Sequence, residues 1–260
     1  MPDDDALAGL AGWWLAKGGH DWPAAGGATC VTEAAIVAAG LPYRAVIGTP
    51  DCPPCFSRPI SAYLMGLNEQ MGDAERQRLM RFVPRLAGIA DAPEVERRRH
   101  EHIVVETLRR VVSSALEAAA ALEAGTPHRE RFGVAEVLRG SAEAYRGASQ
   151  MAQAASLSYD AIRHLRAALA SVSSLAARQA VLASREARNG YEIAGAATAA
   201  RQAWAAWSVL KTDHAARAMA QVWNDTIAIA EGALAIGRQA EPIATEVMVA
   251  RMRQARLPRR

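Results

Sequence analysis

The chain has 260 residues, of which 51% are hydrophobic and only 5% aromatic, and its formal net charge is +3. This length can bury the core of one large domain or two small ones, and the small positive charge is not that of a dedicated nucleic-acid-binding protein. No apolar run approaches the roughly 20 residues of a membrane span, and the acidic start MPDDDALAG is unlike a basic secretory signal. Three cysteines, an odd number, are untypical of a secreted disulfide framework, so we expect a cytoplasmic protein with reduced thiols.

Alanine supplies much of the apolar content of the chain. It is the best helix former, and its small side chain lets helix axes approach closely. The sequence therefore predicts an all-α fold. We expect a compact N-terminal helical module over residues 1–90 and a bundle of long Ala-rich helices over residues 91–260.

The first part of the chain predicts two short helices separated by a glycine-rich loop. Residues 6–17 are almost entirely apolar, and the glycine pair at 18–19 is typical of a helix end. A second helix is predicted over residues 30–39, with Thr29 as its N-cap and Gly40 at its end. Its apolar positions are nearly continuous, so we expect it to be buried on most sides.

A proline-rich turn and two further helices are predicted next. Residues 49–55 (TPDCPPC) favour a turn, because proline removes a backbone donor and biases the preceding residue away from helix. Ser57 and Pro59 are typical of a helix start. Another helix is predicted from Asp73 to Phe82, with Pro84 near its end. The helix that follows Ser57 should bury a stripe with helical spacing, formed by Ile60, Leu64, Leu67 and Met71.

Long helices are predicted for the rest of the chain. Asp91-Ala-Pro-Glu94 combines a capping residue, an early proline and a Glu three residues after the Asp, which indicates a helix start. This helix should extend to about residue 123. Residues 130–256 are predicted to be helical almost throughout, as antiparallel hairpins. Breaks are predicted near Gly140, residues 156–158, Asn189-Gly190, Thr212-Asp213 and Glu241-Pro242.

Residues 20–60 concentrate the side chains that could carry chemistry, including all three cysteines. Cys30 and Glu33 are three residues apart on a predicted helix and therefore share a face. A helix N-terminus also favours the thiolate form of a cysteine. The first interpretation is a zinc site, because thiolate and imidazole are preferred zinc ligands. Its ligands would be drawn from His20, Cys30, Cys52 and Cys55, with Glu33 or Asp51 as a further ligand.

Two other interpretations stay open, because the cysteine spacing matches no standard zinc pattern. One is a reactive thiol, with Cys30 as nucleophile and His20 or Glu33 as its partner. The other is structural, with Cys30 as a small buried hydrophobe and the CPPC segment as a rigid turn. If the chain is an enzyme, Glu33, as general base, and Cys30 are the predicted catalytic residues. The predicted metal ligands are His20, Cys30, Glu33, Asp51 and Cys55.

Charged motifs on the predicted long helices carry weaker signals. His100-Glu101-His102 lacks the HExxH spacing of a metal site and is predicted to be a solvated helix face. Arg97-Arg98-Arg99 alternates with glutamates and is predicted to be an ion-paired surface. The Arg-rich surfaces and C-terminal tail leave nucleic-acid association as a further hypothesis.

A specific order of short motifs runs through residues 19–88. The motifs are Gly19 to His20, Cys30-Val-Thr-Glu33-Ala, Asp51 to Cys55 and Ser57, Leu67-Asn68, and Arg78 to Gly88. This order resembles a family of uncharacterised proteins of bacteriophages and prophages, in which Ala-rich helices often follow. The chain departs from the family pattern at Glu69 and by the addition of Cys52. The resemblance implies no activity or ligand set, but it singles out the same five residues as the predicted metal ligands.

The sequence thus predicts a phage- or prophage-type accessory protein that serves as a metal-stabilised helical interaction or assembly module, with zinc as the expected cofactor. Its long helices would contact a second copy or a protein partner, and no membrane association is expected. The alternative is a metal- or thiol-dependent, hydrolase-like enzyme that uses Cys30, Glu33 and His20 on a small molecule or nucleotide.

Overall fold

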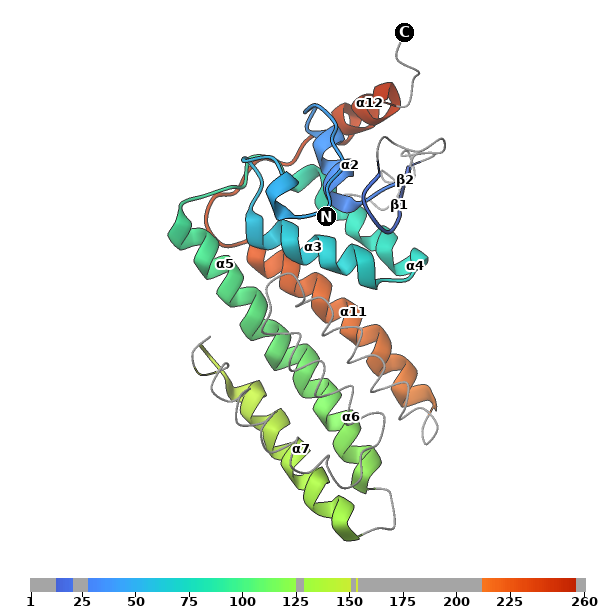
Figure 1. Cartoon of the computed structure of the whole chain (residues 1–260), viewed down its shortest axis with the longest axis vertical. Coiled ribbons are helices and arrows are strands. Elements are labelled where there is room, and N and C mark those ends of the chain that lie inside the picture. The colour runs from blue at the N-terminus through green and yellow to red at the C-terminus, as the bar shows by residue number, and fades with distance from the viewer. Residues whose placement is uncertain (1–12, 21–27, 125–128, 151–152, 154–211, 256–260) are drawn as a thin grey trace. The chain divides into compact units, whose positions relative to one another are not determined.

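The computed structural model describes the chain over residues 13–20, 28–124, 129–150, 153 and 212–255. The described residues are mostly helical, with two very short strands (Figure 1). No helix among them is long and apolar enough to cross a membrane.

The chain folds as two compact units. Unit 1 comprises residues 1–99 and 234–260, and unit 2 comprises residues 100–233. The sequence suggests one boundary near residue 90, but the final segment of the chain packs with the N-terminal residues. Local sequence patterns cannot reveal this return, because it depends on contacts between distant segments.

The N-terminal residues of unit 1 form a parallel pair of strands. β1 (Trp14–Leu15) pairs with β2 (Ala28–Thr29). On the other edge of β1, the side-chain amide of Gln77 accepts a hydrogen bond from Leu15 N and donates one to Leu15 O, both at 2.9 Å. The predicted helix over residues 6–17 is therefore wrong for residues 13–17, because distant partners satisfy an extended backbone there. Residues 6–12 lie outside the described residues.

The second predicted helix is confirmed as α2 (Val31–Ala38), in which every residue is buried. Its N-cap is Cys30 rather than the predicted Thr29. The Cys30 sulfur accepts from Glu33 N, and the Glu33 carboxylate accepts from Cys30 N, which together form a capping box. Gly40 follows the helix at a φ of +72°, the left-handed conformation that glycine adopts freely.

The proline-rich turn contains a single 3-10 turn, η1 (Thr49–Asp51), and is followed by α3 (Arg58–Gln70) with Ser57 as its N-cap. The predicted helix from Asp73 begins as α4 (Asp73–Arg76) but continues as a 3-10 helix, η2 (Gln77–Arg85). Within unit 1, α2 packs against α3 and η2. The predicted stripe of α3 is confirmed, since each of its four side chains is fully buried: Ile60, Leu64, Leu67 and Met71.

A continuous helical segment starts after the predicted Asp91 signal. It consists of α5 (Pro93–Glu106), the π-helical turn η3 (Thr107–Val112) and α6 (Ser113–Ala124). The predicted end near residue 123 is confirmed. The π-helical turn was not predicted, since hydrophobic spacing does not distinguish one wide turn inside a long helix.

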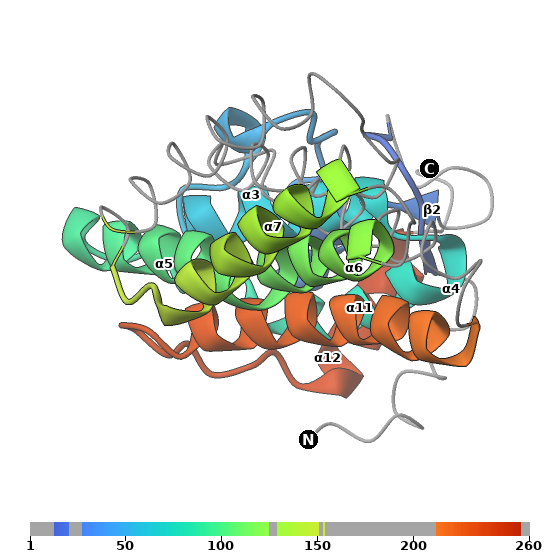
Figure 2. The ribbon, with the colours of Figure 1, turned by 90° about the horizontal axis from the view of Figure 1, so that it is seen from below.

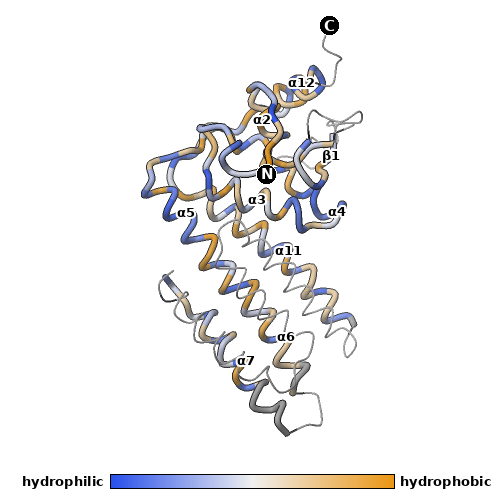
Figure 3. Tube along the Cα trace, in the orientation of Figure 1, coloured by the Kyte–Doolittle hydropathy of each residue, from blue (hydrophilic) through white to orange (hydrophobic). Residues whose placement is uncertain are grey.

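Within unit 2, α6 and α7 (Arg129–Gly147) lie side by side, as both Figure 1 and Figure 2 show. Both helices bury small side chains, including Ala118 and Ala119 of α6 and Ala142 of α7. Hydrophobic and hydrophilic residues alternate along α5 and α6 (Figure 3), as expected for helices with one buried face. The break predicted near Gly140 is wrong, because a single glycine lowers helix stability by only about 1 kcal/mol.

Two further helices complete the described chain, α11 (Thr212–Leu234) and α12 (Thr245–Ala255). The interruption predicted near Glu241-Pro242 is confirmed by the non-helical linker between them. The break predicted near Thr212-Asp213 stays a prediction, because α11 is described only from Thr212 on and residues 154–211 lie outside the described residues. The breaks predicted at residues 156–158 and 189–190 lie outside the described residues. In unit 1, α12 packs against α2 and buries Met248 and Met252.

The His100-Glu101-His102 segment is not the solvated helix face that the sequence predicts. In unit 2 the His102 ring lies against the backbone of Gly232, where an added Cβ would be only 2.3 Å from His102 Nε2. Burial lowers the pKa of both histidines. Glycine at position 232 therefore allows the close approach of α11 to this ring.

Arg99 is fully buried, which corrects the prediction that the Arg97-Arg98-Arg99 run is an ion-paired surface. Its guanidinium donates to the carbonyl groups of Ile89 (2.6 Å) and Ile236 (2.9 Å) and pairs with Glu96 (2.8 Å). Arg97, by contrast, is exposed and pairs with the exposed Glu94, as predicted. Arg99 therefore joins the start of α5 to the linker that leads to α12, within unit 1.

We expect Arg99→Met to lower the free energy of unfolding by about 3 kcal/mol or more, because it leaves buried carbonyl groups and the Glu96 carboxylate without their partner. Arg97→Met removes the same charge two residues earlier on the same helix and should leave the unfolding midpoint nearly unchanged. Urea denaturation followed by circular dichroism measures both. Equal effects of the two substitutions would contradict this role of Arg99.

Candidate functional site

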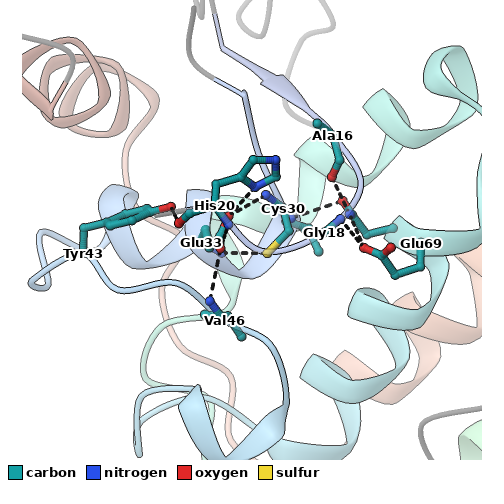
Figure 4. A network of polar contacts seen from close by, with 10 residues as sticks. Ala16, Gly18, His20, Cys30, Glu33, Tyr43, Val46 and Glu69 are labelled. Carbon is teal, nitrogen blue, oxygen red and sulfur yellow. Dashed lines mark hydrogen bonds and ion pairs between the residues drawn. The ribbon is translucent and has the colours of Figure 1, made fainter. Parts of the chain in front are cut away.

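Three of the five predicted site residues meet around the buried carboxylate of Glu33 (Figure 4). Its Oε1 accepts from the backbone N–H groups of His20 (2.8 Å) and Val46 (3.1 Å). Its Oε2 accepts from Cys30 N (2.9 Å) and lies 2.9 Å from His20 Nδ1. A buried carboxylate is tolerated only when its oxygen atoms are satisfied, and here four donors surround it.

His20 is held on both its backbone and its side chain. Tyr43 donates its hydroxyl hydrogen to His20 O, and Glu33 accepts from His20 N. Because an ionised carboxylate can only accept, Nδ1 of His20 carries the proton directed at Glu33. The structure records no partner for Nε2 among the described residues, and the side chain keeps 16% of its surface exposed. A carboxylate on one ring nitrogen orients the other nitrogen, here toward solvent.

Cys30 is unsuited to act as the predicted nucleophile. Its side chain is only 3% exposed, and its sulfur accepts from Glu33 N. Burial is the largest cause that raises the pKa of this thiol, and the charge of Glu33 raises it further. The reactive species is the thiolate, so the geometry favours the structural interpretation of Cys30.

Asp51 and Cys55 form contacts of their own in the turn before α3. Asp51 Oδ2 accepts from the N–H groups of Ile47 and Gly48, both at 3.0 Å, and holds the turn at η1. Cys55 is half-buried, and its carbonyl accepts from Ala90 N at 3.0 Å. Within the part of the chain that the structure describes, no three or more His, Cys, Asp or Glu side chains are grouped so that they could hold a metal ion.

The donor groups that do converge are a poor fit for the expected zinc ion. Both oxygens of Glu33 already accept two hydrogen bonds each, and three of these come from backbone N–H groups. The buried Cys30 sulfur accepts from Glu33 N as the cap of α2, so it too is already engaged in the fold. The described residues therefore form a hydrogen-bonded network rather than a zinc site with the five predicted ligands.

Sequence patterns did not predict two buried polar residues that belong to the hydrogen-bonded network of this region. Asn68 is fully buried and accepts from Val31 N (3.3 Å) and donates to Ala16 O (2.7 Å). Arg76 is also buried and donates to Asn68 O at 2.6 Å. A signal existed for Asn68, because it follows directly on the apolar stripe of α3, where a polar residue requires a buried partner.

The loop that follows α2 carries an apolar side chain with an unusually large solvent-exposed fraction. Among the described residues three large hydrophobic side chains are exposed, and Ile47, at 82%, is exposed far more than Trp14 (46%) or Val247 (42%). Its backbone is nevertheless fixed, since Ile47 N donates to Asp51 and the preceding Val46 N donates to Glu33. We name residues 44–51 the Ile47 loop.

Comparisons of the chain with protein-family models, with curated proteins and with solved structures found no match.

We expect Glu33→Gln to lower the free energy of unfolding by about 3 kcal/mol, because an amide NH2 would face backbone N–H groups that need an acceptor. Glu246→Gln, a matched change at an exposed position of α12, should have a much smaller effect. Urea denaturation of both variants makes the comparison. An unchanged midpoint for Glu33→Gln would show that the network around Glu33 does not stabilise the fold.

Thiol labelling should separate Cys30 from Cys55. Because the pKa of Cys30 is raised and its side chain is buried, iodoacetamide should leave it unlabelled in the native protein between about pH 7 and 9. Half-buried Cys55 should be labelled under the same conditions, and all three cysteines should react in concentrated urea. Peptide mass spectrometry identifies the labelled sites. Faster native labelling of Cys30 than of Cys55 would revive its assignment as a nucleophile.

Proposed function

We propose that this chain is a phage- or prophage-type accessory protein that acts as a protein-interaction module and presents the Ile47 loop to a partner protein. One observation carries the proposal: an isoleucine with 82% of its surface exposed lies on a loop whose backbone is fixed by two carboxylates, Glu33 and Asp51. The resemblance of residues 19–88 to phage proteins supports the accessory role.

The energetics of the Ile47 loop favour binding. Burying an isoleucine side chain contributes roughly 1.5–3 kcal/mol, and this free energy is available only if a partner covers Ile47. A fixed loop also loses little conformational entropy when it binds. Hydrogen bonds from the Ile47 loop to Asp51 and Glu33 therefore make it a preorganised contact point.

The geometry around Glu33 favours recognition over catalysis through Cys30. The thiol is buried and protonated, and the Glu33 carboxylate is occupied by four donors. Neither group is free to act as nucleophile or general base. A zinc ion is not part of this proposal, because the same donors are engaged in the fold. The groups directed at solvent are the Nε2 side of His20 and the side chain of Ile47.

Ile47→Asp should weaken partner binding without destabilising the chain, because the side chain is almost fully exposed. Val247→Asp is the matched control, an exposed valine of unit 1 changed in the same way. The immobilised full-length chain is used to capture proteins from a lysate of the organism that encodes it, and sedimentation velocity measures self-association. We expect a stoichiometric partner that wild type and Val247→Asp retain and that Ile47→Asp binds roughly tenfold less well.

Equal capture by the two variants, or no stoichiometric partner for the wild type, would overturn the proposed function. A thermal melt of each variant checks that the loss of binding does not arise from unfolding. Concentration-dependent dimers that Ile47→Asp abolishes would identify the partner as a second copy of the chain.

A further inference from the structure

Two exposed arginines lie on or beside the Ile47 loop. Arg44 and Arg58 are both exposed, and Arg58 donates from its guanidinium to Thr49 O in the loop. The structure records no ion pair for either arginine within the described residues. The acidic group of the loop, Asp51, already accepts two backbone hydrogen bonds through Oδ2. The charge available to a partner at this surface is therefore mainly positive.

Cys52 packs beneath the loop, and the charged groups near the loop influence the pKa of its thiol. Its sulfur lies 4.0 Å from Gly48 O, and its N–H donates to Thr49 O at 3.1 Å, so it packs against the turn. Burial is the largest cause that raises the pKa of this thiol and the charge of Asp51 raises it further, while the charges of Arg58 and Arg44 lower it. Both guanidinium groups are therefore close enough to the turn to influence a group packed under it.

This charge distribution disfavours a second copy as the occupant. A two-fold contact through the Ile47 loop would place the patch that holds Arg44 and Arg58 against the same patch of the second chain. Like charges at an interface oppose association. Nucleic acid is also a poor match, since the most exposed side chain of the loop is aliphatic and neither pairs with phosphate nor stacks on bases.

We propose that the Ile47 loop docks an acidic segment of a partner protein, whose apolar side chains cover Ile47 and whose neighbouring carboxylates pair with Arg44 and Arg58. The inference rests on the proposed function and specifies the chemistry of the partner. Ile47 supplies the apolar anchor of the contact, and the two arginines supply its orientation and its salt dependence.

Two panels of short synthetic peptides test this chemistry by fluorescence anisotropy with the full chain. Both panels carry the same leucines and phenylalanines, flanked by Asp and Glu in one panel and by Lys and Arg in the other. We expect binding of acidic peptides only, weakening as NaCl rises from about 50 to 500 mM. Ile47→Asp and Arg44→Glu should each weaken it roughly tenfold, which corresponds to 1.4 kcal/mol. Arg217→Glu, the same charge change at an exposed position of unit 2, should not weaken it.

The charge-swapped double variant Arg44→Glu/Arg58→Glu should gain binding to the basic peptides, a result that a merely destabilised loop would not give. Equal binding of the two panels, absence of binding, insensitivity to Ile47→Asp, or binding of a DNA duplex in place of the peptides would overturn the inference. If peptides fail while lysate capture still depends on Ile47, only the partner chemistry is wrong. If capture itself does not depend on Ile47, the proposed function fails.

Discussion

The fully buried carboxylate of Glu33 is the constraint on which the N-terminal part of unit 1 depends. It accepts hydrogen bonds from residues 20, 30 and 46, so one side chain holds the entry to α2, its first turn and the loop that follows it. A carboxylate buried with fewer donors would be strongly destabilising. The close approach of Gly19 to Val46 O, where an added Cβ would lie 3.2 Å away, shows how tightly the two loops pack around this group.

In the irregular segments of this unit, side chains supply the hydrogen-bond partners that helices and strands supply elsewhere. Much of the described chain within residues 13–20 and 28–56 is neither helix nor sheet, yet its backbone polar groups need partners when they are buried. Gln77 completes the edge of β1, Asn68 joins Ala16 to the start of α2, and Arg99 binds carbonyl groups of two separate segments. The polar motif residues are therefore structural first, and a set of His, Cys, Glu and Asp close together in the sequence does not by itself define a reactive centre.

Structure and recognition converge at the same carboxylate. Glu33 binds the N–H group that precedes Ile47, so the network that stabilises the fold also fixes the most exposed apolar side chain of the described chain. Substitution of Glu33 would disturb both properties at once and could not separate them. Exposed residues of the Ile47 loop, which contribute little to the core, are the positions at which recognition can be altered independently.

The sequence by itself determined the mostly helical character of the described residues, the starts of α3 and α5, and the buried stripe of α3, because caps and hydrophobic spacing are local signals. It also grouped His20, Cys30 and Glu33 correctly. Only the tertiary structure decided that Asp51 and Cys55 make separate contacts, that Arg99 is buried, and that β1 is extended. The contacts of Cys55, Arg99 and β1 depend on hydrogen-bond partners far away in the sequence, about which local spacing carries no information. Asp51 instead binds two nearby N–H groups, and its separation from Glu33 follows from the path of the loop between them.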